Sequence, residues 1–378
     1  MSDALTSRPA LAHEAALAAP QATPAPRKPF YIPSLDGIRA VSFLIVFVAH
    51  AGLGQVIPGG LGVTIFFFLS GYLITTLLRM EYDKTDQVNF RQFYVRRMMR
   101  IFPPFYLVLV VATALTAAGI VGGQLRPLAV LSQLFYLNNY YVIATGGFEG
   151  FAPGTGIYWS LAVEEHFYLV FPFVYLLLRR VFPDGRRQAL VLGAACVAVL
   201  IWRCVLVYGL GSTMERTYVA TDTRIDSILF GCILAVFGNP MLDKISVSPQ
   251  RTLFLWVPLG LGTLLFSLIY RNDAFRETFR YTLQGLAFLP LFIAAIRFPT
   301  WPLFSWLNNS WMRLMGALSY SLYLVHQVVL AIVEHYVPLP LLAQGLIGLA
   351  LSYMIAYAMY RAVEQPLARL RRRMLQEA

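Results

Sequence analysis

Residues 61–79 read LGVTIFFFLSGYLITTLLR, and this stretch decides the class of fold. It contains no charged residue before Arg79, and its apolar residues form one block instead of alternating with polar ones. The hydrocarbon core of a bilayer is roughly 30 Å thick, so a helix needs about 20 mostly apolar residues to cross it. The stretch is therefore predicted to be a membrane-spanning helix.

Similar blocks recur along the whole chain of 378 residues. Hydrophobic residues make up 58% of it and charged residues only 13%, with a mean hydropathy of +0.62. Because a soluble domain carries about 25% charged residues, most of this chain is expected to lie in lipid. The sequence predicts an all-α, polytopic integral membrane protein with about ten spans, at residues 38–54, 61–79, 101–122, 158–178, 189–209, 222–237, 252–270, 281–298, 314–335 and 341–363.

The distribution of positive charge predicts the orientation. Of the 30 Lys and Arg residues, 22 fall on the side of the termini, 5 on the other side and 3 inside spans. Short loops rich in Lys and Arg stay in the cytoplasm, so both termini are predicted to be cytoplasmic. The net charge of +11 thus indicates topology. No nucleic-acid partner is expected, because the basic residues are divided among several short loops.

Three parts are predicted along the chain. Residues 1–30 are rich in Ala and Pro without a continuous apolar region, which is typical of a disordered cytoplasmic tail and not of a cleaved signal peptide. Residues 31–370 form the membrane domain, and residues 371–378 form a basic cytoplasmic tail, with no soluble domain expected after the last span. Within the membrane domain, residues 128–143 are predicted to form an amphipathic or half-inserted helix on the outer face.

Ionisable side chains inside spans are costly and are usually functional or paired. The predicted spans contain ten that stand out: Arg39, His50, Glu164, Glu165, His166, Arg203, Asp222, Arg224, Asp226 and His326. The three cysteines also lie within spans, and an odd, intramembrane set favours neither a disulfide framework nor a metal site.

Arg39 and His50 share one face of the first predicted span. Eleven residues make about three turns, so the two side chains lie about 16 Å apart along the helix axis. An imidazole accepts and returns a proton near neutral pH, which makes His50 a candidate general base. The alternative is a buried histidine that only hydrogen-bonds a neighbouring helix.

Glu164 and Glu165 follow Trp159 in the fourth predicted span. Adjacent residues point 100° apart on a helix, so the two carboxylates face different neighbours. One of them could orient a catalytic imidazole while the other pairs with Arg203 or Arg224. A structural ion pair between helices explains them equally well.

Two further polar sets have a functional and a structural interpretation. Asp222 is predicted at the outer surface, where it could contact an acceptor substrate or simply be a solvated helix end. The cluster Arg96, Arg97 and Arg100 precedes the third span on the predicted cytoplasmic side. Guanidinium groups bind phosphates well, so the cluster could hold a phosphorylated ligand, or it could only anchor the topology.

Six motifs together resemble the acyltransferase-3 family of membrane-bound O-acyltransferases, which is found mainly in bacteria. They follow the family's order over residues 31–370, as LDGIRA (35–40) with His50, GLGVTIFFFLSGYLIT (60–75), FYVRRMMRIFP (93–103), YWSLAVEEHF (158–167), LSYSLYLVH (318–326) and YRAVEQP (360–366). Larger members of that family carry a soluble esterase-like domain after the membrane region, some with an extra span before it, and neither is expected here.

The resemblance implies transfer of an acyl group, often acetyl, from cytoplasmic acyl-CoA to a hydroxyl of a carbohydrate, a lipid-linked sugar, a glycoside or another envelope-associated acceptor. The location implied is the plasma (inner) membrane of a bacterium, and no tightly bound cofactor is expected. His50 can act as a general base or can carry the acyl group transiently, and the sequence leaves both open.

The site residues fall into four predicted groups. His50 is catalytic, with Arg39 as its essential partner and Glu165 orienting the imidazole. Arg96, Arg97 and Arg100 hold the CoA phosphates. The acceptor contacts are predicted at Trp159, Glu164, Asp222 and Arg224, and further family-motif residues are Asp36, His326 and Glu364.

A proton-coupled transporter without covalent chemistry is the competing function, since intramembrane His, Glu and Arg also suit a proton carrier. Many such transporters contain inverted repeats with paired, interrupted helices, and neither feature is evident in this sequence.

Overall fold

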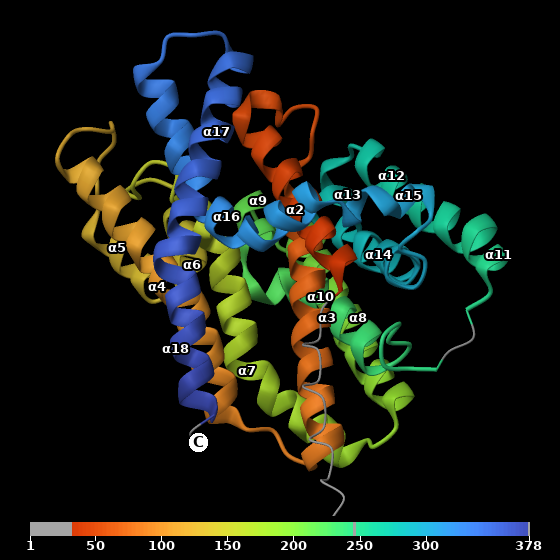
Figure 1. Ribbon diagram of the computed structural model, residues 1–378. Coiled ribbons are helices and arrows are strands. Elements are labelled where there is room, and N and C mark those ends of the chain that lie inside the picture. The colour runs from red at the N-terminus through yellow and green to blue at the C-terminus, as the bar shows by residue number, and fades with distance from the viewer. Residues whose placement is uncertain (1–31, 245–246, 377–378) are drawn as a thin grey trace, which may run out of the picture. The chain divides into compact units, whose positions relative to one another are not determined.

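Every regular element in the described residues is a helix (Figure 1). The structure, a computed structural model, describes residues 32–244 and 247–376. The predicted N-terminal tail, residues 1–30, lies outside them. The long helices are α2 (Pro33–Val48), α3 (Gly59–Thr85), α4 (Phe90–Ala117), α7 (Trp159–Val181), α8 (Gly185–Cys204), α10 (Thr221–Val236), α12 (Val257–Ile269), α14 (Phe279–Arg297), α16 (Ser310–Tyr336), α17 (Leu341–Met359) and α18 (Gln365–Gln376).

Shorter helices, π-helical turns and 3₁₀ turns connect or extend the long helices. The short helices are α5 (Pro127–Leu134), α6 (Asn138–Thr145), α9 (Met214–Val219), α11 (Pro249–Arg251), α13 (Asp273–Glu277) and α15 (Pro302–Ser305). The π turns are Ala49–Leu53, Val205–Gly209, Thr252–Trp256 and Tyr360–Glu364, and two 3₁₀ turns are Gly156–Tyr158 and Trp306–Asn308.

Nine helical stretches of the described residues are long and apolar enough to cross a membrane. They coincide with nine predicted spans, and the prediction of an all-α, polytopic membrane protein is confirmed. The stretches are Pro33–Leu53, Gly59–Thr85, Phe90–Ala117, Gly156–Val181, Gly185–Gly209, Pro249–Ile269, Phe279–Arg297, Ser310–Tyr336 and Leu341–Met374.

The predicted span at 222–237 corresponds to α10, which differs from the other nine. It has 16 residues, against 19 to 34 residues in the nine stretches. Most of its side chains are buried against α3, α8 and α14. α10 is therefore the central helix of the bundle, in contact with protein and not with lipid along most of its surface.

Small residues let α3 and α10 touch through their backbones. A Cβ atom at Gly71 would lie 1.9 Å from the carbonyl oxygen of Ile228, and one at Gly231 would lie 2.0 Å from that of Phe68. Close approach at small residues is the usual way in which helices pack in membranes, where van der Waals contact drives association.

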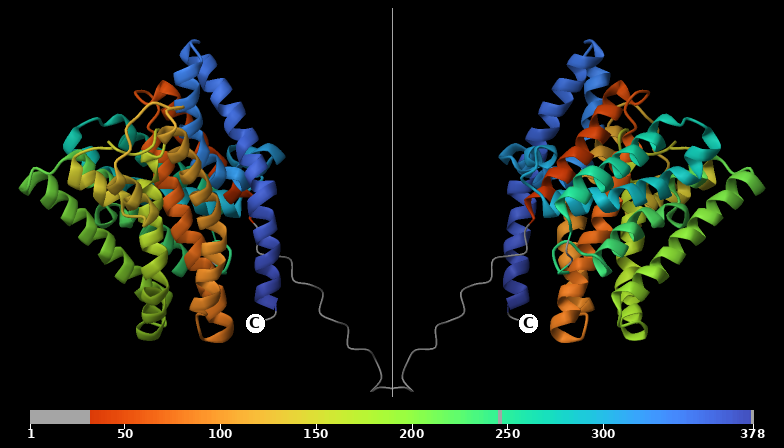
Figure 2. Two further views of the ribbon diagram at one scale, coloured as in Figure 1. Left: turned by 90° about the vertical axis from the view of Figure 1, so that its left-hand side faces the viewer. Right: turned by 90° about the vertical axis from the view of Figure 1, so that its right-hand side faces the viewer.

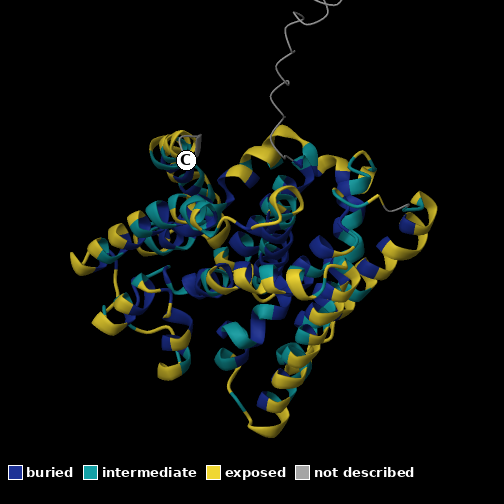
Figure 3. Cartoon of the chain, turned by 90° about the horizontal axis from the view of Figure 1, so that it is seen from below, coloured by how far each residue is buried: buried dark blue, intermediate teal, exposed yellow. Residues whose placement is uncertain are grey.

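The exposed sides of the outer helices are apolar, as a lipid-facing surface requires. Leu259, Leu265 and Ile269 on α12 are all more than half exposed. Figure 3 shows exposed residues along the outward faces of the outer helices and buried residues between them.

Two local predictions need correction. The helix expected at 128–143 is divided into α5 and α6, because Tyr136 between them has a left-handed backbone with φ 56°. The residues expected as a C-terminal tail from 371 onward continue α18 as far as Gln376. Figure 2 shows α18 as the continuation of α17, joined through the π turn Tyr360–Glu364.

Candidate active site

His50 lies in the π turn Ala49–Leu53, which directly follows α2. Gly52 in this turn has φ 100°, a left-handed conformation that side chains rarely adopt. A Cβ atom at Gly52 would also lie 2.4 Å from a methyl carbon of Leu341 on α17. The turn therefore depends on glycine, and it presents the exposed His50 side chain at the end of the helix.

The His50 imidazole pairs with a second histidine on α16. Its Nδ1 lies 3.0 Å from Nε2 of His326, and the two rings stack with centroids 5.3 Å apart. His326 is fully buried, whereas His50 is exposed. One member of the pair can thus reach a substrate while the other holds it in place.

The surroundings of His326 assign the tautomer of both rings. Nδ1 of His326 lies 2.8 Å from the carbonyl oxygen of Tyr323 and 3.2 Å from that of Leu322. Carbonyl oxygens only accept, so this nitrogen carries the proton in the neutral ring, and Nε2 of His326 accepts from Nδ1–H of His50. It follows that Nε2 of neutral His50 has a free lone pair.

The start of α7 holds α16 at the level of His326. The Tyr158 hydroxyl donates to the carbonyl oxygen of Leu324 at 2.8 Å, and the hydroxyls of Ser160 and Tyr323 lie 2.7 Å apart. The motif that contains Trp159 and Ser160 thus supports the histidine pair from the neighbouring helix.

Glu165 does not orient His50, contrary to the sequence prediction. No hydrogen bond joins these side chains within the described residues, and His326 occupies the Nδ1 side of the imidazole. Glu165 instead lies within electrostatic range of Arg97, Tyr106 and Tyr136. The reason is helical geometry, since this face of α7 is turned toward α4 and the α5–α6 segment.

Glu164 takes part in a chain of polar contacts between α3 and α7. The Ser70 hydroxyl donates to its carboxylate at 2.6 Å, and the Tyr168 hydroxyl donates to Ser70 at 3.1 Å. The guanidinium of Arg97 lies over the Tyr168 ring, 5.1 Å from its centroid. Glu164 is therefore connected through Ser70 and Tyr168 to the arginine cluster.

A cationic cavity of about 800 Å³ lies between the ends of α3, α4 and α18. Among the described residues, its lining has five basic side chains and one carboxylate, that of Glu81, which pairs with Arg96 at 3.2 Å. The basic residues are Lys84, Arg96, Arg97, Arg100 and Arg371. The predicted trio of arginines thus lines one cavity, which is suited to a ligand with several negative charges.

Two residues of this cavity, Lys84 and Arg371, were missed by the sequence analysis. Arg371 belongs to a run of C-terminal basic residues that was interpreted as a tail. In the structure its guanidinium lies 3.4 Å from the carbonyl oxygen of Arg96. The run of C-terminal arginines indicates a possible anion-binding residue in the sequence. Only the packing of α18 on α4 shows which of these arginines lines the cavity.

The cavity and the histidine pair are linked along α16. The Tyr320 hydroxyl donates at 2.8 Å to the carbonyl oxygen of Ile101, the residue after Arg100. His326 follows Tyr320 by six residues, a rise of about 9 Å along the helix. On the same helix Ser321 donates to Glu364 at 2.5 Å, so this motif glutamate ties α16 to the π turn before α18.

Arg39 lies with the arginine cluster and not with His50. It pairs with Asp36 at 3.1 Å, and the charges of Arg97 and Arg100 are within its electrostatic range. Asp36 lies at a close helix contact, because a Cβ atom at Gly316 of α16 would be 2.0 Å from its carbonyl oxygen. Arg39 is predicted as the essential partner of His50, and within the described residues no hydrogen bond joins the two side chains.

Arg224 is fully buried and is surrounded by aromatic rings. Its guanidinium lies 4.0 Å from the ring centroid of Tyr281 and 5.7 Å from that of Trp159. It donates to the Tyr218 carbonyl oxygen and to Thr64, and within the described residues no carboxylate lies within 4 Å. Burial raises the pKa of Tyr218, so this ring remains neutral beside the cation.

The predicted pairing of Glu164 or Glu165 with Arg203 or Arg224 is wrong. Arg203 binds Asp226 through two hydrogen bonds of 2.9 and 2.7 Å, with both side chains fully buried. This pair joins α8 to α10.

Asp222 is occupied by structural partners. Arg216 donates to both of its oxygens, at 3.0 and 2.5 Å, and Trp202 donates at 2.7 Å. Of the four predicted acceptor contacts, only Trp159 and Arg224 lie together, and the structural interpretation of Asp222 is favoured.

The structure is thus that of a polytopic membrane protein with an exposed imidazole and a cationic cavity. The chain belongs to the acyltransferase domain family, whose profile matches residues 32–361. It is 32% identical over 352 residues to the O-acetyltransferase OatA of Staphylococcus aureus strain NCTC 8325, and equally so to OatA of strain COL. These alignments cover 90% of this chain but only 57% of each relative. No solved structure matches.

Proposed function

We propose that this chain is a membrane O-acyltransferase that moves an acyl group, in the first instance acetyl, from acyl-CoA to a hydroxyl of a carbohydrate or other envelope-associated acceptor. The observation that carries the proposal is the His50–His326 hydrogen bond, which leaves Nε2 of His50 as a free base at an exposed position. The family and the names of the relatives support the same class of reaction.

The cationic cavity is the proposed binding site for the CoA phosphates. Arg97, Arg100 and Arg371 supply planar donors that match phosphate oxygens, and Lys84 adds a point charge. The charge bias of the loops assigns this side to the cytoplasm, where acyl-CoA is made. An anionic donor cannot cross the bilayer. In this proposal its phosphates bind in the cationic cavity, and its acyl group extends from there into the membrane domain.

The thioester reaches the histidine pair along α16 in this proposal. Tyr320 lies beside the arginine cluster and His326 is about 9 Å further along the helix. The long pantetheine arm spans this separation while the phosphates remain on the arginines. Arg39, near Arg97 and Arg100, then contributes to donor binding, which gives this residue a role without contact to His50.

The proposed reaction uses His50 as a general base. Nε2 takes the proton of the acceptor hydroxyl as the oxygen attacks the thioester carbonyl, so a C–O bond forms and the C–S bond breaks. The thiolate of CoA then receives the same proton from Nε2. The products are the acyl ester and free CoA, and the histidine returns to its starting state.

His326 is the proposed positioning residue. Nε2 of His326 accepts the hydrogen bond from Nδ1–H of His50 whether His50 is neutral or protonated. This hydrogen bond strengthens when His50 becomes an imidazolium. The third member of a catalytic triad does the same for its histidine. The buried aromatic neighbours Phe43 and Tyr323, with ring centroids 5.6 Å from that of His326, limit its movement.

The test measures acetyl transfer in proteoliposomes that contain the full chain, labelled acetyl-CoA and envelope glycans as acceptor. His50→Ala is expected to lose transfer while it inserts and unfolds like the parent chain. His335, an exposed histidine at the C-terminal end of α16, provides the matched control, and His335→Ala is expected to keep full activity.

Three outcomes contradict the proposal. Full transfer by His50→Ala removes the catalytic role of this residue. A stable acyl-enzyme on His50 in the absence of acceptor replaces the general base with an acyl carrier. Movement of glycan across the membrane without any acylation supports the transporter instead.

A further inference from the structure

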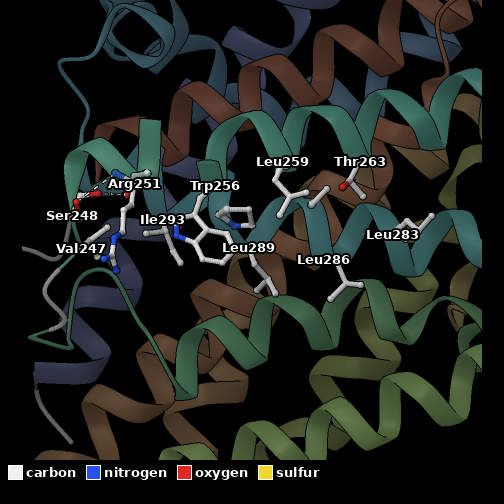
Figure 4. A pocket seen from close by; sticks show the side chains of 14 residues that line it. Val247, Ser248, Arg251, Trp256, Leu259, Thr263, Leu283, Leu286, Leu289 and Ile293 are labelled. Carbon is white, nitrogen blue, oxygen red and sulfur yellow. Dashed lines mark hydrogen bonds between the residues drawn. The ribbon is translucent and has the colours of Figure 1, made fainter. Parts of the chain in front are cut away.

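A second, mainly apolar groove of about 690 Å³ lies between α12 and α14 (Figure 4). Its volume is in the range of roughly 300–1,000 Å³ that is usual for small-molecule sites. Its lining shares no residue with the cationic cavity. Leu259 and Leu286 on its rim are each about half exposed, so the groove opens on the lipid-facing surface.

The local sequence explains why a groove forms here. The π turn Thr252–Trp256 inserts an extra residue into the helix before α12, and such turns often mark functional positions. Further along, Gly260 allows a close crossing, since a Cβ atom there would lie 3.0 Å from the carbonyl oxygen of Ala287 and 3.1 Å from a ring carbon of Pro290. The two helices therefore meet at one point and form the floor of the groove.

One end of the groove is basic. Figure 4 shows Arg251 at this end, Trp256 next to it, and Leu259, Leu286 and Leu283 further along. The Arg251 guanidinium makes no hydrogen bond or ion pair with another residue of 32–244 or 247–376, and its side chain is exposed. Arg and Trp together are typical of the level of lipid head groups.

The length of the groove matches one leaflet of a bilayer. The chain rises about 18 Å from Arg251 to Thr263 at 1.5 Å per residue. Half of a hydrocarbon core of roughly 30 Å is about 15 Å. A ligand with a negative charge at one end and an extended apolar chain fits both the charge and the length.

We propose that this groove binds one anionic glycerophospholipid of the surrounding bilayer. Its phosphate lies on Arg251, its glycerol region lies at Trp256, and one acyl chain follows the leucines toward Thr263. Basic pockets between spanning helices on the cytoplasmic side recognise anionic head groups, and charge bias assigns the Arg251 loop to that side. The proposal is independent of the acyl-transfer reaction.

The experiment uses native mass spectrometry of the full chain, released from nanodiscs that contain equal amounts of phosphatidylglycerol and phosphatidylcholine. The parent chain is expected to retain one phospholipid, with phosphatidylglycerol preferred. Arg251→Gln is expected to reduce this preference about 5-fold, because one arginine near an anionic lipid contributes about 1 kcal/mol. Arg187→Gln, an exposed arginine at the start of α8 outside the groove, is the matched control and keeps the preference.

A second variant tests the apolar part of the site. Thr263→Trp fills the far end of the groove and is expected to lower retention of both lipids, whereas Arg251→Gln lowers only the preference between them. Equal preferences in Arg251→Gln and Arg187→Gln overturn the proposal, as does the absence of retained lipid from the parent chain. Displacement of the lipid by inorganic phosphate alone would also overturn it, by showing a site for free phosphate.

Discussion

Nδ1 of His50 lies 3.0 Å from Nε2 of His326, although 276 residues separate the two along the chain. His50 lies in the π turn Ala49–Leu53 that follows the opening helix α2, and His326 lies in the middle of α16. These helices pack along one another, so the pair forms only in the folded bundle. The contact gives the exposed imidazole a fixed tautomer and a buried support.

Removing the support should slow the reaction without weakening donor binding. His326→Ala is expected to lower kcat by about 100-fold, at the lower end of the range for acid–base catalysis, with the KM for acyl-CoA unchanged. His326→Gln should recover part of the loss, because its side-chain oxygen can accept from Nδ1–H of His50. Steady-state kinetics and pH profiles of both variants check this. Equal kcat values for the parent and both variants would contradict the positioning role.

Donor affinity should depend on the cationic cavity. Arg100→Gln and Arg371→Gln are each expected to raise the KM for acyl-CoA by roughly 10-fold or more, since a hydrogen bond to a charged group contributes about 1.5–3 kcal/mol. The kcat should change little. Arg313→Gln, exposed at the start of α16 and outside the cavity, is the control. Unchanged KM values at positions 100 and 371 would leave these arginines as topology anchors only.

The π turn at His50 should not tolerate a side chain at Gly52. Gly52→Ala introduces a methyl group at φ 100° and toward Leu341, at a backbone cost of about 1–3 kcal/mol. The expected result is a loss of acyl transfer of at least about 10-fold and a lower melting temperature. Gly262→Ala on α12 places its methyl group in open space and should be neutral. Parent-like activity of Gly52→Ala would show that the turn does not position His50.

The buried ion pair should be sensitive to the loss of one partner. Asp226→Asn leaves the Arg203 cation without its carboxylate at a position with no solvent, and the expected cost is about 3–5 kcal/mol of the free energy of unfolding. Thermal unfolding in detergent measures it. Asp273→Asn is the control, because its carboxylate is 94% exposed and should contribute almost nothing. Similar stability losses in the two variants would contradict this account.

The predicted orientation can be mapped with reporter fusions. Gly147, in the loop after α6, is expected on the outer side, and the C-terminus on the cytoplasmic side, because the Lys and Arg bias favours that arrangement. An alkaline phosphatase fusion at Gly147 should be active and a fluorescent-protein fusion at the C-terminus should fluoresce. The opposite pattern would place the cationic cavity outside the cell and remove the route for acyl-CoA.

Much of the site was visible in the sequence as residue types. His50 and the arginines at 96, 97 and 100 stood out because charge inside or beside an apolar block is costly. Their partners did not. A carboxylate such as Glu165 is the expected partner of His50, because carboxylates usually orient catalytic imidazoles, yet the neighbour is His326. Arg203 likewise pairs with Asp226, which lies 23 residues away on another helix.

The sequence by itself determined that this protein is a helical membrane bundle, where most of its spans lie and which residues carry charge into them. It could do so because hydropathy is a local property, set by each segment and its lipid solvent. Only the tertiary structure decided that α10 is an inner helix, that His326 holds His50 and that Arg371 joins the cationic cavity. These contacts join helices that are far apart in the chain. They depend on which face of each helix points toward which neighbouring helix.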